Sequence, residues 1–333
     1  MLRRISLGLL AAAAFLTLLF TQHADAGVIT FGSGANTFDM TFVEIGSPDN
    51  ADDTTGAPNP AGKVEYTYQM GKYEVSRDMI TKANAVGGLG ITLADMSSYG
   101  GNGVDKPATG VSWNEAARFV NWLNTSQGFQ AAYNFTTDGV NDNIALWSST
   151  DAWQLGGENL YRHKDAHYWL PSMDEWYKAA YYNPNTGVYG DYPSLDGNEP
   201  SAVSSGTADN TAVFNQTSAQ GSADITQAGG LSPFGIMGLG GNVYEWEETS
   251  FDLNNSTGSS GRGVRGGGSW DFISSGLSSS FRIDDLPADV FTNVGFRVAS
   301  LSSPATVPEP GSLVVWSAIC VGGLCYRRRR ARK

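Results

Sequence analysis

Apolar and polar residues alternate in two stretches near the start of the chain. Residues 27–46 show this period of two, with apolar side chains recurring at Phe38, Met40, Phe42 and Ile45. The pattern is typical of half-buried β-strands. Residues 63–75 alternate in the same way and predict a second pair of strands, carried by Tyr66, Tyr68, Met70 and Tyr73. The polar segment 49–62, which contains two prolines, predicts a surface loop between them.

Three helix starts are visible as capping signals. Ser76 is placed to cap a helix over residues 77–85, and Ser112 and Ser172 are each followed three residues later by a glutamate, Glu115 and Glu175. Such a spacing is a capping box, in which each side chain bonds the other residue's backbone. The segment after Ser112 also carries apolar residues at helical spacing, namely Ala116, Phe119, Val120 and Leu123.

The rest of the chain predicts short strands and long loops. Strands are expected at 168–171, around 263–266 and at 294–298, whereas residues 124–160 form a polar insertion and residues 183–232 a loop-rich region. No repeat of fixed period is present, which disfavours solenoids and propellers. Abundant glycine and aromatic residues with few long apolar runs favour an irregular α+β fold.

The two ends of the chain predict export. Residues 1–26 combine an early pair of arginines, an apolar run and a small-residue cleavage site, as in a secretory signal peptide; a membrane anchor is the alternative. Residues 304–333 contain Pro308-Glu309-Pro310, an apolar stretch from Leu313 to Tyr326 and a basic end. This order resembles the PEP-CTERM sorting signal of Gram-negative bacteria.

The resemblance implies a transient inner-membrane anchor, cleavage by an exosortase, and release to the cell surface or extracellular matrix. A plain C-terminal anchor is the alternative. Arginines after the apolar run are expected to stay on the cytoplasmic side.

Removing the ends changes the charge and the cysteine content. Residues 27–308 hold 13 of the 21 Lys and Arg residues but 31 of the 33 Asp and Glu residues, a formal net charge of −18. Such a surface repels phosphate backbones, so we expect no nucleic-acid partner. Both cysteines, Cys320 and Cys325, lie in the tail, so the body has no disulfide framework and no thiol nucleophile.

Several motifs occur in a fixed order along the body: Tyr68 to Ser76, Tyr168 to Trp176, Gly240 to Trp246, Arg265 to Trp270, and Val294 to Val298. Together they resemble the formylglycine-generating enzyme family, also called the sulfatase-modifying factor family. The resemblance implies that family's α+β, C-type-lectin-like fold with little regular secondary structure. It predicts three parts, with a signal peptide at 1–26, the family domain at 27–303 and the sorting segment at 304–333.

The family's oxidase chemistry depends on two copper-binding cysteines after the Arg-Gly-Gly-Ser motif. In this chain the corresponding positions carry Phe272 and Leu277 or their neighbours. Because copper(I) requires soft sulfur ligands, we expect neither copper binding nor cysteine oxidation, and we assign no catalytic residue.

Calcium is the chemistry that the resemblance carries over. It implies Asn242 and Glu245 as side-chain ligands with carbonyls around Val243, and a second site at Asn210 and Asp224. Calcium takes six to eight hard oxygen ligands, including carbonyls in turns. The alternative is that the Asn242 and Glu245 side chains only form hydrogen bonds within the turn.

We interpret three further residues, Trp246, Trp270 and Arg297, as part of the structural framework. Glu247 and Glu248 are expected to be exposed to solvent.

Other chemistry is weakly signalled. His163 and His167 would share one face of a helix and could chelate a metal, but the strand that follows favours a loop. No Gly-x-Ser-x-Gly elbow accompanies them.

We therefore expect a calcium-stabilised, non-oxidase binding module that offers an aromatic groove to a peptide or glycan. The alternatives are a divergent oxidoreductase of the same family with a nonheme metal, and a passive component of the extracellular matrix.

Overall fold

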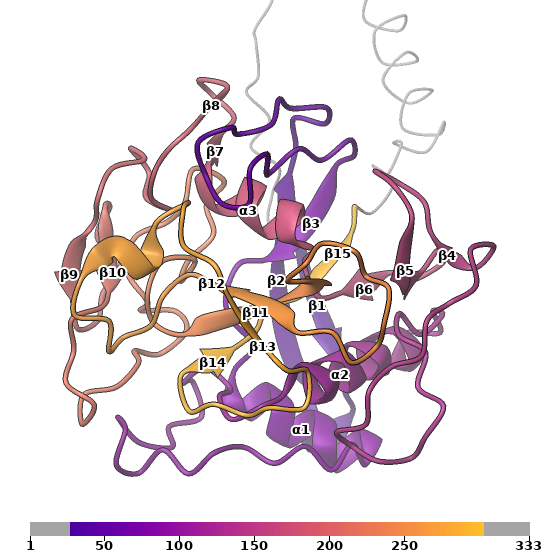
Figure 1. The fold of residues 1–333 in the computed structure, drawn as a ribbon. Coiled ribbons are helices and arrows are strands. Elements are labelled where there is room, and N and C mark those ends of the chain that lie inside the picture. The colour runs from indigo at the N-terminus through magenta and orange to yellow at the C-terminus, as the bar shows by residue number, and fades with distance from the viewer. Residues whose placement is uncertain (1–26, 303–333) are drawn as a thin grey trace, which may run out of the picture.

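The computed structural model describes residues 27–302. The predictions made for residues 1–26 and 304–333 lie outside the described residues. Within 27–302 the chain forms three α-helices, many short strands and long connecting loops (Figure 1). No helix in this range is long and apolar enough to cross a membrane. The expected α+β fold with little regular structure is confirmed.

A five-stranded antiparallel sheet holds both ends of the described chain. Its order is β1 (Gly27–Phe31), β2 (Phe38–Ile45), β3 (Tyr68–Gly71), β15 (Ala299–Leu301) and β6 (Tyr168–Trp169). A short 3₁₀ turn, η1 (Gly34–Asn36), lies between β1 and β2. The alternation in residues 38–45 is real, since Phe38, Met40, Phe42 and Ile45 are all buried.

The second predicted strand pair is shorter than expected. Of residues 63–75, only Tyr68–Gly71 form a strand, β3. These four residues lie between β2 and β15 and bond both. Tyr66 lies outside this strand. Its ring packs on Tyr68 and Trp153 instead of on a residue of a neighbouring strand.

A four-stranded sheet is built around the Gly-Asn-x-x-Glu-Trp motif. Its order is β13 (Ile283–Asp285), β12 (Arg262–Arg265), β11 (Tyr244–Ser250) and β14 (Val294–Gly295). The register of β11 against β12 shifts between Trp246 and Ser250. Both faces of β11 are covered, since all residues from Tyr244 to Glu248 are buried.

The three predicted helices begin where the capping signals place them. They are α1 (Arg77–Gly87), α2 (Trp113–Ser126) and α3 (Met173–Tyr181). The capping boxes of Ser112 with Glu115 and of Ser172 with Glu175 are both formed. Helix α1 runs two residues beyond the predicted end at residue 85 and stops at Gly88, which adopts a left-handed conformation.

The loop-rich regions contain small paired strands. These are β4 (Ala152–Trp153) with β5 (Asn159–His163), β7 (Tyr182–Asn183) with β8 (Val188–Tyr189), and β9 (Ser201–Val203) with β10 (Thr211–Val213). A 3₁₀ turn, η2 (Ser274–Leu277), follows the Arg-Gly-Gly segment. Large side chains join these pieces, since Trp113, Trp169, Trp176 and Trp246 are fully buried in one core.

Candidate functional site

Strand β11 carries three buried glutamates. Glu245, Glu247 and Glu248 are all 0% exposed, so the prediction that Glu247 and Glu248 are solvated was wrong. Each meets an arginine: Glu245 accepts from Arg297, Glu247 from Arg265 and Arg282, and Glu248 from Arg162. Buried charges persist only when they are paired and hydrogen-bonded. The arginine partners lie 18 to 86 positions away along the chain, where a local sequence pattern does not reveal them.

Arg162 is the centre of the largest of these networks. Its Nη2 lies 2.6 Å from Oε2 of Glu248 and 3.0 Å from Oε2 of Glu175. Burial alone would raise the pKa of Glu175, but the Arg162 guanidinium and the Tyr66 hydroxyl hold that pKa below its usual range. Burial raises the pKa of Glu248, despite the same arginine. The Tyr133 hydroxyl and the Asn159 amide add further hydrogen bonds to Glu248.

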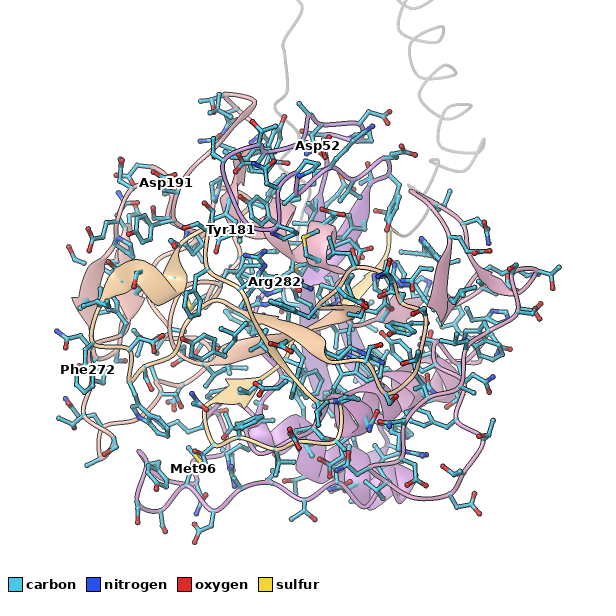
Figure 2. The ribbon with its side chains drawn as sticks, in the orientation of Figure 1. Asp52, Met96, Tyr181, Asp191, Phe272 and Arg282 are labelled. Carbon is cyan, nitrogen blue, oxygen red and sulfur yellow. The ribbon has the colours of Figure 1, made fainter. Side chains whose placement is uncertain are left out.

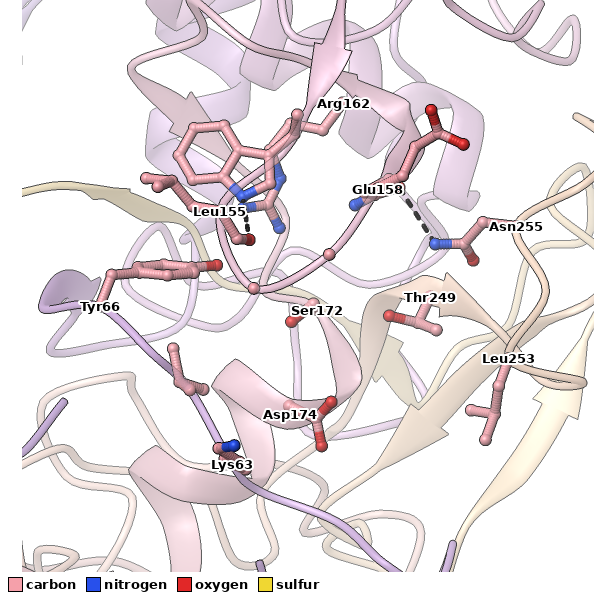
Figure 3. A pocket seen from close by; sticks show the side chains of 15 residues that line it. Lys63, Tyr66, Leu155, Glu158, Arg162, Ser172, Asp174, Thr249, Leu253 and Asn255 are labelled. Atoms are coloured by element: carbon pink, nitrogen blue, oxygen red, sulfur yellow. Dashed lines mark hydrogen bonds between the residues drawn. The ribbon is translucent and has the colours of Figure 1, made fainter. Parts of the chain in front are cut away.

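A small polar cleft opens above this network (Figure 3). Its walls come from the turn between β4 and β5, the loop before β3, the start of α3, and the end of β11 with the loop that follows. Figure 3 shows Tyr66 on one side and Leu253 with Asn255 opposite, with Arg162 behind. The volume is about 210 Å³, below the roughly 300 to 1,000 Å³ of sites for drug-sized ligands. The cleft therefore suits a small polar group.

The cleft contains one carboxylate held ready to accept a hydrogen bond. Oδ1 of Asp174 accepts from the Gly62 N–H at 2.6 Å, and Oδ2 has no partner among residues 27–302. Burial, together with the neighbouring Glu247, Asp52 and Glu175, raises the pKa of Asp174 to about 6. A carboxyl shifted in this way inside a cleft is a marker of a functional site.

Other polar groups in the cleft are already committed to the protein. Asn159 donates to Glu248, and Asn255 donates to Asn159. The Tyr66 hydroxyl donates to Glu175 at 2.6 Å, and burial raises its pKa well above the usual value. These contacts leave Asp174, the exposed Glu158 and Lys63 as the groups best able to meet a ligand.

The segment that corresponds to the family's oxidase cysteines is not built for a metal. Phe272 is 81% exposed, and Figure 2 shows it at the edge of the molecule, pointing outward. Leu277 is completely buried and packs with Ala212 and Phe214. Residues 27–302 contain no cysteine at all. Two ligands of one ion must face a common point, and these two side chains lie in opposite environments.

The first predicted calcium set is engaged in internal contacts. Glu245 accepts from Arg297 through both carboxylate oxygens at 2.6 Å, and from the Trp176 indole at 2.7 Å. The Asn242 carbonyl oxygen accepts from the Ala223 N–H, and its amide donates to Glu74. Val243 lies buried between them. A guanidinium on the carboxylate repels a second cation, so this donor set does not fit calcium.

One oxygen beside Asn242 stays without a partner. Oε1 of Glu74 is buried and accepts no hydrogen bond within residues 27–302. Burial and the nearby Glu245 raise the pKa of Glu74 well above its usual value. Glu74 therefore lies close to Glu245 in a buried site, where it accepts a hydrogen bond from Asn242 through its other oxygen.

The second predicted calcium pair is also occupied. The Asn210 side chain accepts from the Asp196 N–H at 3.3 Å. Asp224 lies 3.6 Å from the Lys106 ammonium, with its side chain about half exposed. No described contact joins Asn210 to Asp224. Groups of three or more His, Cys, Asp or Glu side chains that could hold a metal are absent from the part of the chain that the structure describes.

The two histidines do not lie on a helix. His163 ends β5, stacks edge-on against Trp147, and accepts from the Asp165 N–H through Nδ1. His167 stacks on Phe129 with ring centres 4.3 Å apart. The loop predicted for this region fits the structure better than a helix that chelates a metal.

Trp246 and Arg297 are framework residues, as predicted, while Trp270 is half-buried against Tyr99.

The cleft itself was missed by the sequence analysis. Asp174 and Ser172 had been read only as part of a helix start, and Trp153 as part of an unassigned insertion. The Trp153 ring contacts Tyr66, which lies 87 positions earlier in the chain, and it also lies under the Arg162 guanidinium. Only the alternating tyrosines before β3 hinted at an aromatic surface.

Comparisons with other proteins agree on the fold. The structure of Treponema denticola variable protein 1 is 18% identical, with a TM-score of 0.57 over 83% of this chain and 99% of that one. CarF is also 18% identical, with a TM-score of 0.54 over 79% of this chain and 98% of that one. PvdO from Pseudomonas aeruginosa aligns at 16% identity with a TM-score of 0.49. No curated protein matches the sequence.

The sequence matches the sulfatase-modifying factor enzyme 1-like domain over residues 27–301. This range contains every motif that carried the resemblance, and both sheets and all three helices described above. The chain therefore belongs to the sulfatase-modifying factor family and has its α+β, C-type-lectin-like fold.

Proposed function

We propose that this chain is a non-oxidase member of its family that binds a small polar ligand in the cleft above Arg162. The observation that carries the first half is that residues 27–302 hold no cysteine; the family resemblance matches its cysteine positions to Phe272 and Leu277 or their neighbours. An exposed Phe272 and a buried Leu277 supply neither sulfur ligands nor a shared site.

The cleft supports the second half. Asp174 keeps one oxygen free, and the fully satisfied ion network behind it holds the walls in place. A rigid site loses little entropy on binding. A ligand hydroxyl or ammonium group would donate to Asp174, while the Tyr66 and Trp153 rings would contact its apolar face.

The oxidase half is tested with the purified full chain, a copper salt and a cysteine peptide of the sulfatase type. Mass spectrometry of the peptide is expected to show no aldehyde product, and metal analysis of the protein no stoichiometric copper or iron. Formation of the aldehyde, or a bound equivalent of either metal, would favour the divergent oxidoreductase instead.

The binding half is tested by saturation-transfer NMR of the full chain with a set of monosaccharides and free amino acids. We expect hits that disappear in Asp174→Asn and persist in Asp165→Asn, a matched change at an exposed aspartate two residues after β5 that does not line the cleft. A set in which no hit is lost on Asp174→Asn would reject the cleft as the site.

Export is part of the proposal. Residues 1–26 would direct secretion and residues 304–333 would act as a sorting segment cut by an exosortase at the inner membrane. Deleting residues 304–333 is expected to move the protein from the cell surface into the medium or periplasm, as followed by immunoblotting of cell fractions. Unchanged surface retention would argue against a sorting role for the tail.

A further inference from the structure

A second concave site lies on the other side of the ion network. This α2 groove is bounded by Gly87 and Gly88 at the end of α1, by one face of α2, and by the loop 131–147. It shares no lining residue with the cleft. Its volume is about 540 Å³, inside the range of roughly 300 to 1,000 Å³ typical of ligand sites.

Aromatic rings line the α2 groove, and each is held by other contacts. Trp147 donates from its indole to the Ala132 carbonyl at 2.9 Å. Trp122 packs on Phe38 and Phe119 with ring centres about 6 Å apart. The Phe135 ring lies 3.8 Å from the Arg118 guanidinium carbon. Trp122 belongs to the core and Arg118 covers part of the Phe135 ring, so the apolar surface of the groove comes mainly from the half-buried Trp147 and the rest of Phe135.

Polar groups beside these rings remain available. The side chains of Asn134 and Asp138 make no hydrogen bond to residues 27–302. Arg118 donates only to the Thr137 carbonyl, at 3.2 Å. An amide both donates and accepts, a carboxylate accepts, and a guanidinium donates.

The charge in the groove is nearly balanced. Burial lowers the pKa of Arg118, and the carboxylates of Asp142 and Asp138 act in the opposite direction. One cation between two carboxylates, on a body of net charge −18, repels sulfated or phosphorylated ligands. Among glycans, neutral ones are therefore favoured over sulfated or phosphorylated ones.

We propose that the α2 groove is a binding site for neutral glycans. A pyranose ring has an apolar C–H face, which stacks on aromatic rings, and a rim of hydroxyls, which both donate and accept. Trp147 and Phe135 match the first property, and Asn134, Asp138 and Arg118 match the second. A peptide would bind most strongly by adding backbone hydrogen bonds along an open strand edge. In the groove, the backbone at Asn134 is already paired with that of Ala145, so this position offers no such edge.

The test uses the full chain and printed neutral trisaccharides built from glucose, mannose, xylose or N-acetylglucosamine, beside sulfated and uronic-acid glycans. Binding to at least one neutral glycan is expected, with titration calorimetry to measure its affinity. Asp138→Ala and Trp147→Phe are expected to weaken that affinity at least tenfold and threefold, respectively.

Asp174→Asn serves as the control, because it alters the cleft and leaves the α2 groove intact. Its affinity for the neutral glycan should equal that of the unaltered chain. The inference is overturned if no neutral glycan binds, if charged glycans bind better, or if Asp174→Asn removes binding while Asp138→Ala does not. The last outcome would place the glycan in the cleft and leave the proposed function standing.

Discussion

Arg162 and Glu248 form a fully buried ion pair although 86 positions separate them in the chain. The Arg162 Nη2 lies 2.6 Å from Oε2 of Glu248, and its Nε lies 3.0 Å from Oε1. The same guanidinium also serves Glu175 on α3. One arginine therefore joins β5, α3 and β11 directly beneath the cleft, and holds the site in shape.

Replacing Arg162 should destabilise the fold strongly. Arg162→Met leaves Glu175 and Glu248 buried without their cation, which costs about 3 to 5 kcal/mol of unfolding free energy. Urea denaturation followed by tryptophan fluorescence measures the loss. Lys82→Met is the control, because Lys82 pairs with Asp78 at the surface of α1 and should change stability by less than about 0.5 kcal/mol. A loss below 1 kcal/mol for Arg162→Met would contradict this account of the network.

Asp174 should make stability depend on pH. Its pKa of about 6 in the folded chain lies above the ordinary value of 3.8, so the folded state holds the proton more tightly than the unfolded state does. The contribution to stability is therefore full below about pH 4 and is lost as pH rises through 6.

Asp174→Asn should consequently be more stable than the unaltered chain at pH 7.5, by about 1 to 2 kcal/mol, because solvent in the cleft screens part of the cost. The difference should shrink towards pH 4. Thermal unfolding at a series of pH values tests this, with Asp165→Asn expected to show no such trend. A constant difference at all pH values would rule out Asp174 as the titrating group.

The environments of Phe272 and Leu277 predict thiol reactivity. In a chain with both tail cysteines changed to serine, Phe272→Cys should react at once with a thiol reagent, whereas Leu277→Cys should react only after unfolding. The double variant should show one fast thiol and no copper(I) binding. Two fast thiols, or a copper(I) complex, would mean that the two positions face each other.

Chelation should leave the melting temperature unchanged. The Glu245 carboxylate accepts hydrogen bonds from Arg297, the Asn242 side chain bonds Ala223 and Glu74, and Asp224 lies beside Lys106. Differential scanning calorimetry with EDTA, and again with added calcium, is expected to give shifts within experimental error. A chelator-dependent fall would restore the calcium site implied by the family resemblance and require different ligands.

Local signals in the sequence were enough to place the helices and the outer strands. The capping boxes at Ser112 and Ser172 act within four residues, and the alternation in residues 38–45 needs only one buried face. The ordered motifs identified the family, and the missing cysteines argue against its copper chemistry. Each of these inferences depends on residue type and short spacing alone.

Only the tertiary structure showed which charged side chains are buried and which residues meet in the cleft, because both depend on contacts between distant parts of the chain. Glu247 and Glu248 resemble solvated residues in sequence, yet arginines from β5, β12 and the segment before β13 bury them. Arg297 likewise engages Glu245, and Arg162 joins the elements that bring Asp174, Tyr66 and Trp153 to one cleft. The burial of a charge depends on whether a partner lies within about 3 Å in space, and spacing along the chain does not encode that distance.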